Sequence, residues 1–156
     1  MRIIANLDEF STLVGQSLGH TPYLTITQSM VDQFAEATGD RQWIHTDPAR
    51  ARAESPFGAS VAHGFLTLSL APQLLASLYR IDSVKIGINY GANRIRFTQA
   101  VPVDSQLRLQ ATLKQVEPQP APAGQRGLRA TFDCVFERAG SNKPVCVAEL
   151  ITLFFE

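Results

Sequence analysis

Two different spacings of apolar residues divide the chain. Before about residue 83 the apolar positions recur every three or four residues, and after it they alternate with polar positions. The first spacing is typical of amphipathic helices and the second of strands with one face in water. We therefore expect helices in the first half and a sheet in the second, which is an α+β arrangement.

The clearest amphipathic helix is predicted over residues 28–38. Thr27 is a suitable N-cap for it, and Gly39 is a typical helix end. A shorter helix near the N-terminus, capped by Asp8, is expected to end before Gly15.

The segment from Phe65 to Tyr79 is apolar on nearly every side of a helix axis. Such a helix must be buried, and its 15 residues are short for a membrane span. Pro72 removes one backbone hydrogen bond, so we expect a kink or a short break there.

The alternating apolar and polar residues of the second half predict a mostly antiparallel sheet. Strands are expected in segments 84–90, 95–97, 107–113, 128–136 and 144–155, with a short one earlier at 23–27. The last strand is apolar on both faces and should be central, AGSN at 139–142 should close a hairpin, and residues 117–127 should form an exposed loop. Because the dry face of the sheet and the apolar helix each need a partner, the sheet should curl around the helix.

Composition narrows the class of protein. A chain of 156 residues with 45% hydrophobic residues predicts a single domain over residues 1–156. The 14 basic and 14 acidic residues form no run of like charge, so neither nucleic acid nor a membrane surface is an expected partner. The N-terminus does not resemble a secretory signal, and a cytoplasmic protein is expected. Cys134 and Cys146 are interpreted as buried, reduced fillers of the core.

The stretch GDRQWIHTDPARA at residues 39–51 is the first candidate for chemistry. Asp40 and His45 flank a tight connection between two predicted helices. A carboxylate and an imidazole on one side of a cleft can transfer a proton near neutral pH. The alternative is that Asp40 only stabilises a turn and His45 is a surface or core histidine, and spacing alone does not decide between the two.

The rest of that stretch is interpreted as structural. Asp47 followed by Pro48 is typical of an N-cap and the first helical residue. Trp43 and Ile44 are interpreted as anchors that pack the connection against the core.

The second candidate is His63-Gly64, where the apolar helix begins. Free backbone N–H groups at a helix start can hold a developing oxyanion. In the alternative, Gly64 only relieves crowding between helix and sheet, and His63 caps or packs.

Other kinds of site are not indicated. The chain has no G-x-S-x-G, P-loop or G-x-G-x-x-G motif, and its three histidines are too scattered to predict a metal site. Lys85, Arg94 and Arg96 are placed on the wet side of their strands. They are interpreted as solvated, with contact to the phosphates of a ligand as the alternative.

The stretch GDRQWIHTDPARA, followed 18 residues after His45 by AHGF, resembles the MaoC-like dehydratase family, in particular its NodN-like branch and the (R)-specific enoyl-CoA hydratases. The resemblance extends over almost the whole chain, from DEFSTLVG through YGANRIRFTQAVPVDSQL to the final strands. It implies a hot-dog fold, in which a curved antiparallel sheet wraps a long helix, and pairing into homodimers.

The family pattern G-D-x-N-P-x-H implies roles for single residues. It places the catalytic dyad on Asp40 and His45, and the backbone N–H that binds the thioester oxygen on Gly64, beside His63. The chain departs from the pattern at Gln42-Trp43, which stand where the family has Asn-Pro. Gln42 still offers an amide, one methylene further out, so acyl-chain preference is expected to differ.

The resemblance further implies that an acyl-CoA is the substrate and that no cofactor is needed. The expected reaction is addition of water to a trans-2-enoyl-CoA, giving an (R)-3-hydroxyacyl-CoA. Two alternatives stay open. A hot-dog thioesterase would release free thiol, and a binding module would neither hydrate the substrate nor release thiol.

Overall fold

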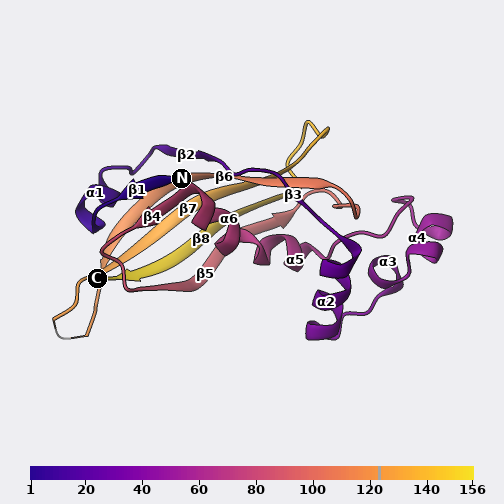
Figure 1. The fold of residues 1–156 in the computed structure, drawn as a ribbon, viewed down its shortest axis with the longest axis horizontal. Helices are drawn as coiled ribbons and strands as arrows, with labels where there is room; N and C mark the ends of the chain where they lie inside the picture. Colours follow the sequence, from indigo (N-terminus) through magenta and orange to yellow (C-terminus); the bar gives the residue numbers. More distant parts are fainter. Residues whose placement is uncertain (123) are drawn as a thin grey trace.

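A curved antiparallel sheet packs against a broken helix, and three further helices lie beyond one end of the sheet (Figure 1). The computed structural model describes residues 1–122 and 124–156. In chain order the elements are β1 (Arg2–Ile4), α1 (Leu7–Ser11), β2 (Ser17–His20), β3 (Leu24–Thr25), α2 (Gln28–Thr38), α3 (Trp43–Thr46), α4 (Pro48–Glu54), α5 (Gly64–Ser69), α6 (Ala71–Leu78), β4 (Tyr79–Ile81), β5 (Ile86–Phe97), β6 (Gln106–Gln119), β7 (Gly127–Arg138) and β8 (Cys146–Phe155).

The large sheet has the strand order β2-β6-β7-β8-β5, with β3 also paired to β6. All of these pairings are antiparallel, while β1 and β4 form a separate parallel pair. Buried and half-buried residues alternate along β7, as the period-2 pattern predicts. The prediction that the last strand is central is confirmed, because β8 lies between β7 and β5.

The apolar helix is broken where proline predicts a break. It ends as α5 at Ser69 and resumes as α6 at Ala71, with Pro72 in the first turn of α6. The prediction that it is buried on nearly every side is wrong, because one side is exposed along both helices, at Ser69, Pro72, Gln73, Ala76 and Ser77. Phe65 is also exposed, at 62%, and packs edge to face on Phe97.

The exposed strand β5 is a second departure from the predicted pattern. One wet face was expected along residues 84–97, yet almost every residue of β5 is exposed. The reason is its place at the edge of the sheet, with β8 as its only strand neighbour among the described residues. Large apolar side chains on it therefore reach the surface, including Ile86, Ile88 and Tyr90.

The predicted loop at 117–127 is too long. Residues 117–119 continue β6 and pair with residues 127–129 of β7, with Pro118 opposite Leu128. Strand pairing between two long neighbours overrides the local signal of the prolines. Residue 123 of this segment lies outside the described residues.

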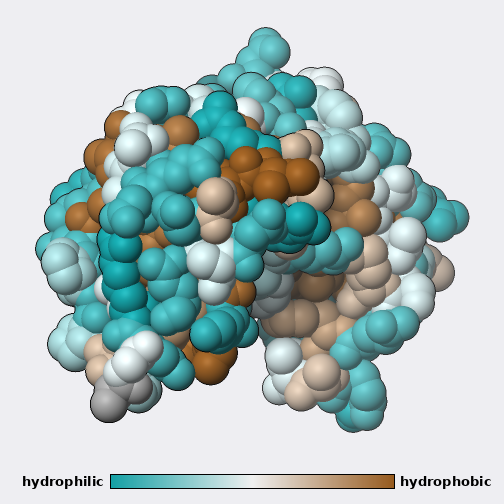
Figure 2. All heavy atoms as spheres, turned by 60° about the vertical axis from the view of Figure 1, so that its left-hand side comes forward, coloured by the Kyte–Doolittle hydropathy of each residue, from teal (hydrophilic) through white to brown (hydrophobic). Residues whose placement is uncertain are grey.

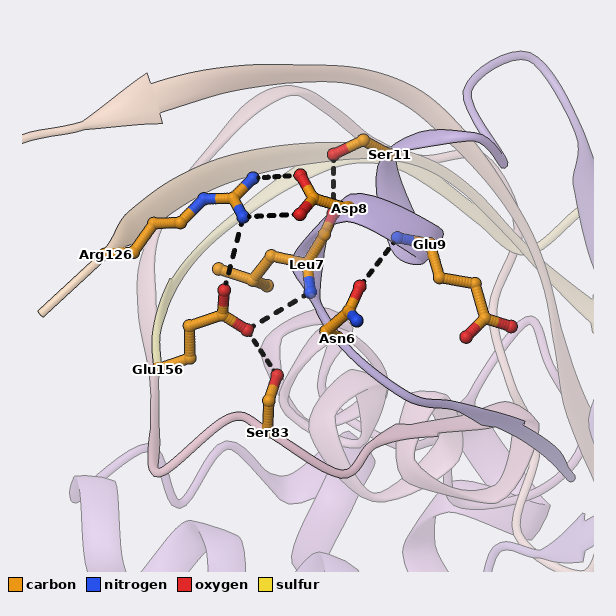
Figure 3. A network of polar contacts seen from close by, with 8 residues as sticks. All are labelled: Asn6, Leu7, Asp8, Glu9, Ser11, Ser83, Arg126 and Glu156. Atoms are coloured by element: carbon orange, nitrogen blue, oxygen red, sulfur yellow. Dashed lines mark hydrogen bonds and ion pairs between the residues drawn. The ribbon is translucent and has the colours of Figure 1, made fainter.

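The N-terminal helix forms, but its cap is not the predicted one. Asn6 caps α1 by accepting a hydrogen bond from the Glu9 backbone N–H over 2.9 Å. Asp8 instead lies in the first turn, where its carboxylate accepts two hydrogen bonds from the Arg126 guanidinium, which hold the pKa of Asp8 below its usual value (Figure 3).

Glu156 connects this helix to the other end of the chain (Figure 3). Its carboxylate accepts from the Leu7 backbone N–H over 3.2 Å and from the Ser83 hydroxyl, and forms an ion pair with Arg126 over 3.4 Å. These contacts join α1, the turn before β5, the start of β7 and the end of β8.

The segment with the candidate dyad is built from short helices. The predicted helix 28–38 is confirmed, with Thr27 as its N-cap and Gly39 left-handed at its end, with φ 80°. The predicted start at Asp47-Pro48 is also confirmed, since Asp47 accepts from the Arg50 backbone N–H over 3.0 Å. Trp43 is half-buried, with the Arg50 guanidinium 4.4 Å above its ring.

Two further observations concern the cysteines and the lengths of the helices. Both cysteines are free and buried, and burial raises the pKa of Cys134 to about 12 and that of Cys146 to about 11. No helix in the described part of the chain is long and apolar enough to cross a membrane.

Candidate active site

The turn between α2 and α3 brings Asp40 and His45 to one place. Asp40 follows the left-handed Gly39, and its side chain is 57% exposed. His45 lies in α3 and is 7% exposed. A solvent-exposed carboxylate therefore lies beside a largely buried imidazole.

The orientation of the His45 ring follows from its hydrogen bond to Val61. The Nδ1 atom lies 2.6 Å from the Val61 carbonyl oxygen, which can only accept, so Nδ1 carries the hydrogen. The Nε2 atom is then left with the lone pair. This tautomer can take up a proton at Nε2, as a general base must.

Burial lowers the pKa of His45 below its ordinary value of 6.5. The hydrogen bond to Val61 opposes this effect, the neighbouring His63 adds to it, and the Asp40 carboxylate opposes it. His45 is therefore neutral, and able to accept a proton, at neutral pH.

The structure brings His63 into the same cluster. Its Nε2 atom lies 2.9 Å from the Asp40 carbonyl oxygen and 4.0 Å from the Oδ2 atom of that residue. Its ring stacks on His45, with centroids 3.8 Å apart and planes 26° from parallel. Sequence reasoning placed His63 with Gly64 on the oxyanion side and missed this contact with the dyad.

The three side chains could be mistaken for a metal centre. Asp40, His45 and His63 each offer a ligand atom, and these atoms lie within 4.8 Å of one another. However, the lone pair of an imidazole lies in its ring plane, and the stacked rings of His45 and His63 have nearly parallel planes, so the two lone pairs do not converge on one ion. The arrangement fits proton transfer better than metal ligation.

Gly64 is the first residue of α5, and its backbone N–H has no acceptor among the described residues. A Cβ added to it would lie 2.8 Å from two ring atoms of Phe97. Crowding against Phe97 is therefore one physical reason for a glycine at this position. The backbone N–H of Gly64 remains free for a ligand. Gly64, Thr67 and Phe97 line a cavity of about 330 Å³.

Gln28 and Ser60, which the sequence did not indicate, support the dyad through hydrogen bonds that reach the backbone of His45. The Gln28 side chain donates to the His45 carbonyl oxygen over 2.7 Å, and the buried Ser60 hydroxyl donates to Gln28. Gln42 acts through its backbone, whose carbonyl accepts from the His45 N–H over 2.9 Å. The Gln42 side chain is without a hydrogen-bond partner among the described residues.

Lys85, Arg94 and Arg96, which were interpreted as solvated with phosphate contact as the alternative, lie on or beside the exposed strand β5. Arg94 forms an ion pair with Glu149 over 3.4 Å, and the Arg96 guanidinium donates to the neighbouring Ile95 carbonyl. Lys85 is exposed. None of the three contacts Asp40 or His45, and contact with the phosphates of a ligand stays the alternative to solvation.

An apolar groove runs between α5–α6 and the strands β5 and β8. Two adjoining cavities, of about 170 and 380 Å³, share Pro72, Leu75, Asn89 and Thr152. Figure 2 shows that apolar side chains reach the surface on this side of the molecule and that a hollow opens beside them. The groove begins one helical turn beyond Gly64, because its first lining residue is Leu68.

The sequence and fold are similar to those of known proteins. The family described as MaoC like domain matches residues 9–127. The chain is 44% identical over 154 residues to 3-hydroxyacyl-thioester dehydratase Z of Mycobacterium tuberculosis, covering 99% of each chain. It is 38% identical to nodulation protein N of Rhizobium meliloti over 149 residues, which are 95% of this chain and 90% of that protein.

A solved structure shows the fold. The (R)-hydratase from A. caviae involved in PHA biosynthesis superposes with a TM-score of 0.69 at 22% identity, over 89% of this chain and 94% of that one. The predicted α+β hot-dog arrangement, with a curved sheet around a central helix, is confirmed.

Proposed function

The chain belongs to the MaoC-like dehydratase family and is an enzyme of the dehydratase/hydratase class, and on this basis we propose that it adds water to trans-2-enoyl-CoA esters to give (R)-3-hydroxyacyl-CoA, and catalyses the reverse dehydration. The observation that carries the proposal is the dyad: Asp40 beside a buried His45 whose Nε2 lone pair is free, near the free N–H of Gly64.

Each step of the addition can be assigned to a group of this chain. Asp40 and the His45 Nε2 bind one water molecule, and together they take its proton as its oxygen attacks C3. Charge develops on the thioester oxygen, which accepts a hydrogen bond from the Gly64 N–H. The dyad then returns a proton to C2. The addition of water is redox-neutral overall, so it requires no redox cofactor.

The groove beside α5 and α6 supports an acyl substrate. It is lined mostly by apolar side chains, and it passes Ser69 and Pro72 on its way from the Gly64 end of the helix. In this proposal the thioester lies at Gly64 and the acyl chain follows the groove. Apolar walls bind such a chain by removing it from water.

The test is to incubate the purified protein with crotonyl-CoA and longer trans-2-enoyl-CoA esters, following enone absorbance and free thiol together. Loss of the enone with the thioester intact, and an (R)-3-hydroxy product on chiral analysis, is the expected result. Release of thiol would identify a thioesterase instead. A folded protein that changes neither signal at any chain length would be a binding module.

The pH dependence of hydration follows from the lowered pKa of His45. A histidine base works in its neutral form, so the rate rises with pH through the pKa of His45. Because burial lowers this pKa in the free enzyme, the acid limb of the kcat/KM profile is expected below pH 6.5. Initial rates with crotonyl-CoA between pH 4.5 and 8 check this, and a limb above 6.5 would contradict it.

We also propose that the enzyme is a homodimer joined along β5. This edge strand exposes its hydrogen-bonding groups together with Ile88, Tyr90 and Phe97, which are 46%, 62% and 41% exposed. Such an edge favours pairing with another strand. Sedimentation is expected to give twice the 17.1 kDa of one chain.

Ile88→Lys is expected to convert the dimer to monomer at micromolar concentration, since it places a charge in the paired edge. Ile3→Lys is the matched control, because Ile3 is similarly exposed, at 57%, but lies on β1. A wild-type protein that sediments as a monomer would refute the dimer.

A further inference from the structure

His63 has an unusual position for a residue beside an active site. It is 3% exposed and directly precedes α5. Its ring lies against His45, with centroids 3.8 Å apart, and against Phe34, with centroids 5.0 Å apart. Its Nε2 atom lies 2.9 Å from the Asp40 carbonyl oxygen. One buried ring therefore contacts both members of the proposed dyad.

His63 belongs to a set of contacts between two short segments. The Val61 N–H donates to the Ile44 carbonyl over 3.0 Å, and the Val61 carbonyl accepts from His45 Nδ1. His63 adds the third contact, to Asp40. Because Gly64 follows His63 directly, these bonds fix the distance between the free N–H of Gly64 and the dyad.

The state of the ring follows from its partners. The Asp40 carbonyl can only accept, so Nε2 carries the hydrogen of His63. The Nδ1 atom is then a lone pair, buried and without a partner among the described residues. A phenylalanine of similar shape would pack here without that cost. The single N–H of His63 is used to bind the backbone of Asp40. Packing alone therefore does not explain a histidine at this position.

We propose that His63 is a positioning residue for the hydration reaction. Its N–H fixes the Asp40 carbonyl, and with it the start of the dyad turn, while its ring restrains rotation of His45 by stacking. This role rests on the proposed function, since it acts through Asp40 and His45 and not on the substrate. Its effect is expected on kcat more than on KM.

The test compares His63→Phe with His63→Gln in the enoyl-CoA assay. Phenylalanine keeps the stacked ring and removes the N–H, whereas glutamine keeps an N–H donor and removes the ring. Each variant is expected to lower kcat by about 10- to 100-fold, with KM changed by less than about threefold, because small errors in position are costly in catalysis. Circular dichroism verifies that each variant folds.

The pH profile supplies a readout that packing alone would not change. The titratable groups that act on His45 are Asp40, from the turn after α2, and His63 itself, whereas Gln28 and Val61 contribute groups that do not titrate. His63→Phe removes a neighbour that disfavours the charged form of His45. The acid limb of kcat/KM should therefore move to higher pH than in wild type.

Phe34→Leu is the matched control. Phe34 packs on His63 but has no hydrogen bond to the dyad, so this variant should keep the wild-type acid limb and most of kcat. If His63→Phe behaves like this control, the positioning role is refuted. Loss of folding in both His63 variants would assign the ring to the core and equally overturn it. An inactive wild type would instead refute the proposed function.

Discussion

Asp40→Asn and His45→Gln are each expected to lower the hydration rate by about 10²–10⁴-fold. The asparagine keeps the shape of the carboxylate but cannot take a proton from water. The glutamine keeps a donor for the Val61 carbonyl, but its amide oxygen is not basic, so the proton acceptor that His45 offers at Nε2 is lost. KM for crotonyl-CoA should change little, because neither group is proposed to bind the acyl chain or CoA.

Two matched controls separate loss of chemistry from loss of structure. Asp47→Asn makes the same change in the same segment, and asparagine still caps α4. His20→Gln changes an exposed histidine of β2 whose Nε2 atom lies 3.7 Å from the Glu137 carboxylate and which has no hydrogen bond to Asp40 or His45. Both controls should keep nearly full activity. Asp40→Asn with wild-type turnover would remove that residue from the mechanism.

The double variant tests whether Asp40 and His45 act on one water molecule. If they do, removing the second group after the first should cost little more, since residues that act as a unit are not additive in their effects on rate. Rate losses that multiply would indicate two independent contributions and contradict the shared water.

Local sequence signals predicted the elements that local chemistry determines. The helix 28–38 formed as expected because Thr27 and Gly39 are strong end signals next to a clear apolar stripe. The N-terminal cap was misassigned because Asn6 and Asp8 are both good caps two residues apart. The exposure of β5 could not be foreseen, since it depends on which strand lies at the edge.

The candidate site was only partly readable from the chain. Spacing alone left Asp40 and His45 undecided, and the family resemblance was needed to prefer a dyad. The position of His63 on that dyad depends on hydrogen bonds between segments distant in the sequence, from Val61 to Ile44 and from His63 to Asp40. Gln28 lies at a helix start, where nothing in the sequence indicates that its side chain reaches His45.

Gly64→Ala is expected to lower kcat by about 10- to 100-fold, although alanine keeps the backbone N–H proposed to bind the thioester oxygen. The added Cβ would lie 2.8 Å from the Cγ and Cδ2 atoms of Phe97, so either the ring or the start of α5 must move. A shift of α5 would carry the N–H away from the dyad. Steady-state kinetics with crotonyl-CoA measure the loss.

The double variant Gly64→Ala/Phe97→Leu distinguishes the two reasons for a glycine at this position. Leucine replaces the flat ring with a smaller, flexible side chain, so the Cβ would fit and most of kcat should return, while Phe97→Leu alone should change kcat little. Recovery would mean that Phe97 requires the glycine and that the substrate uses only its N–H. If the double variant stays as slow as Gly64→Ala, the substrate itself must approach the Cα of Gly64, and the thioester lies closer to α5 than the N–H contact alone requires.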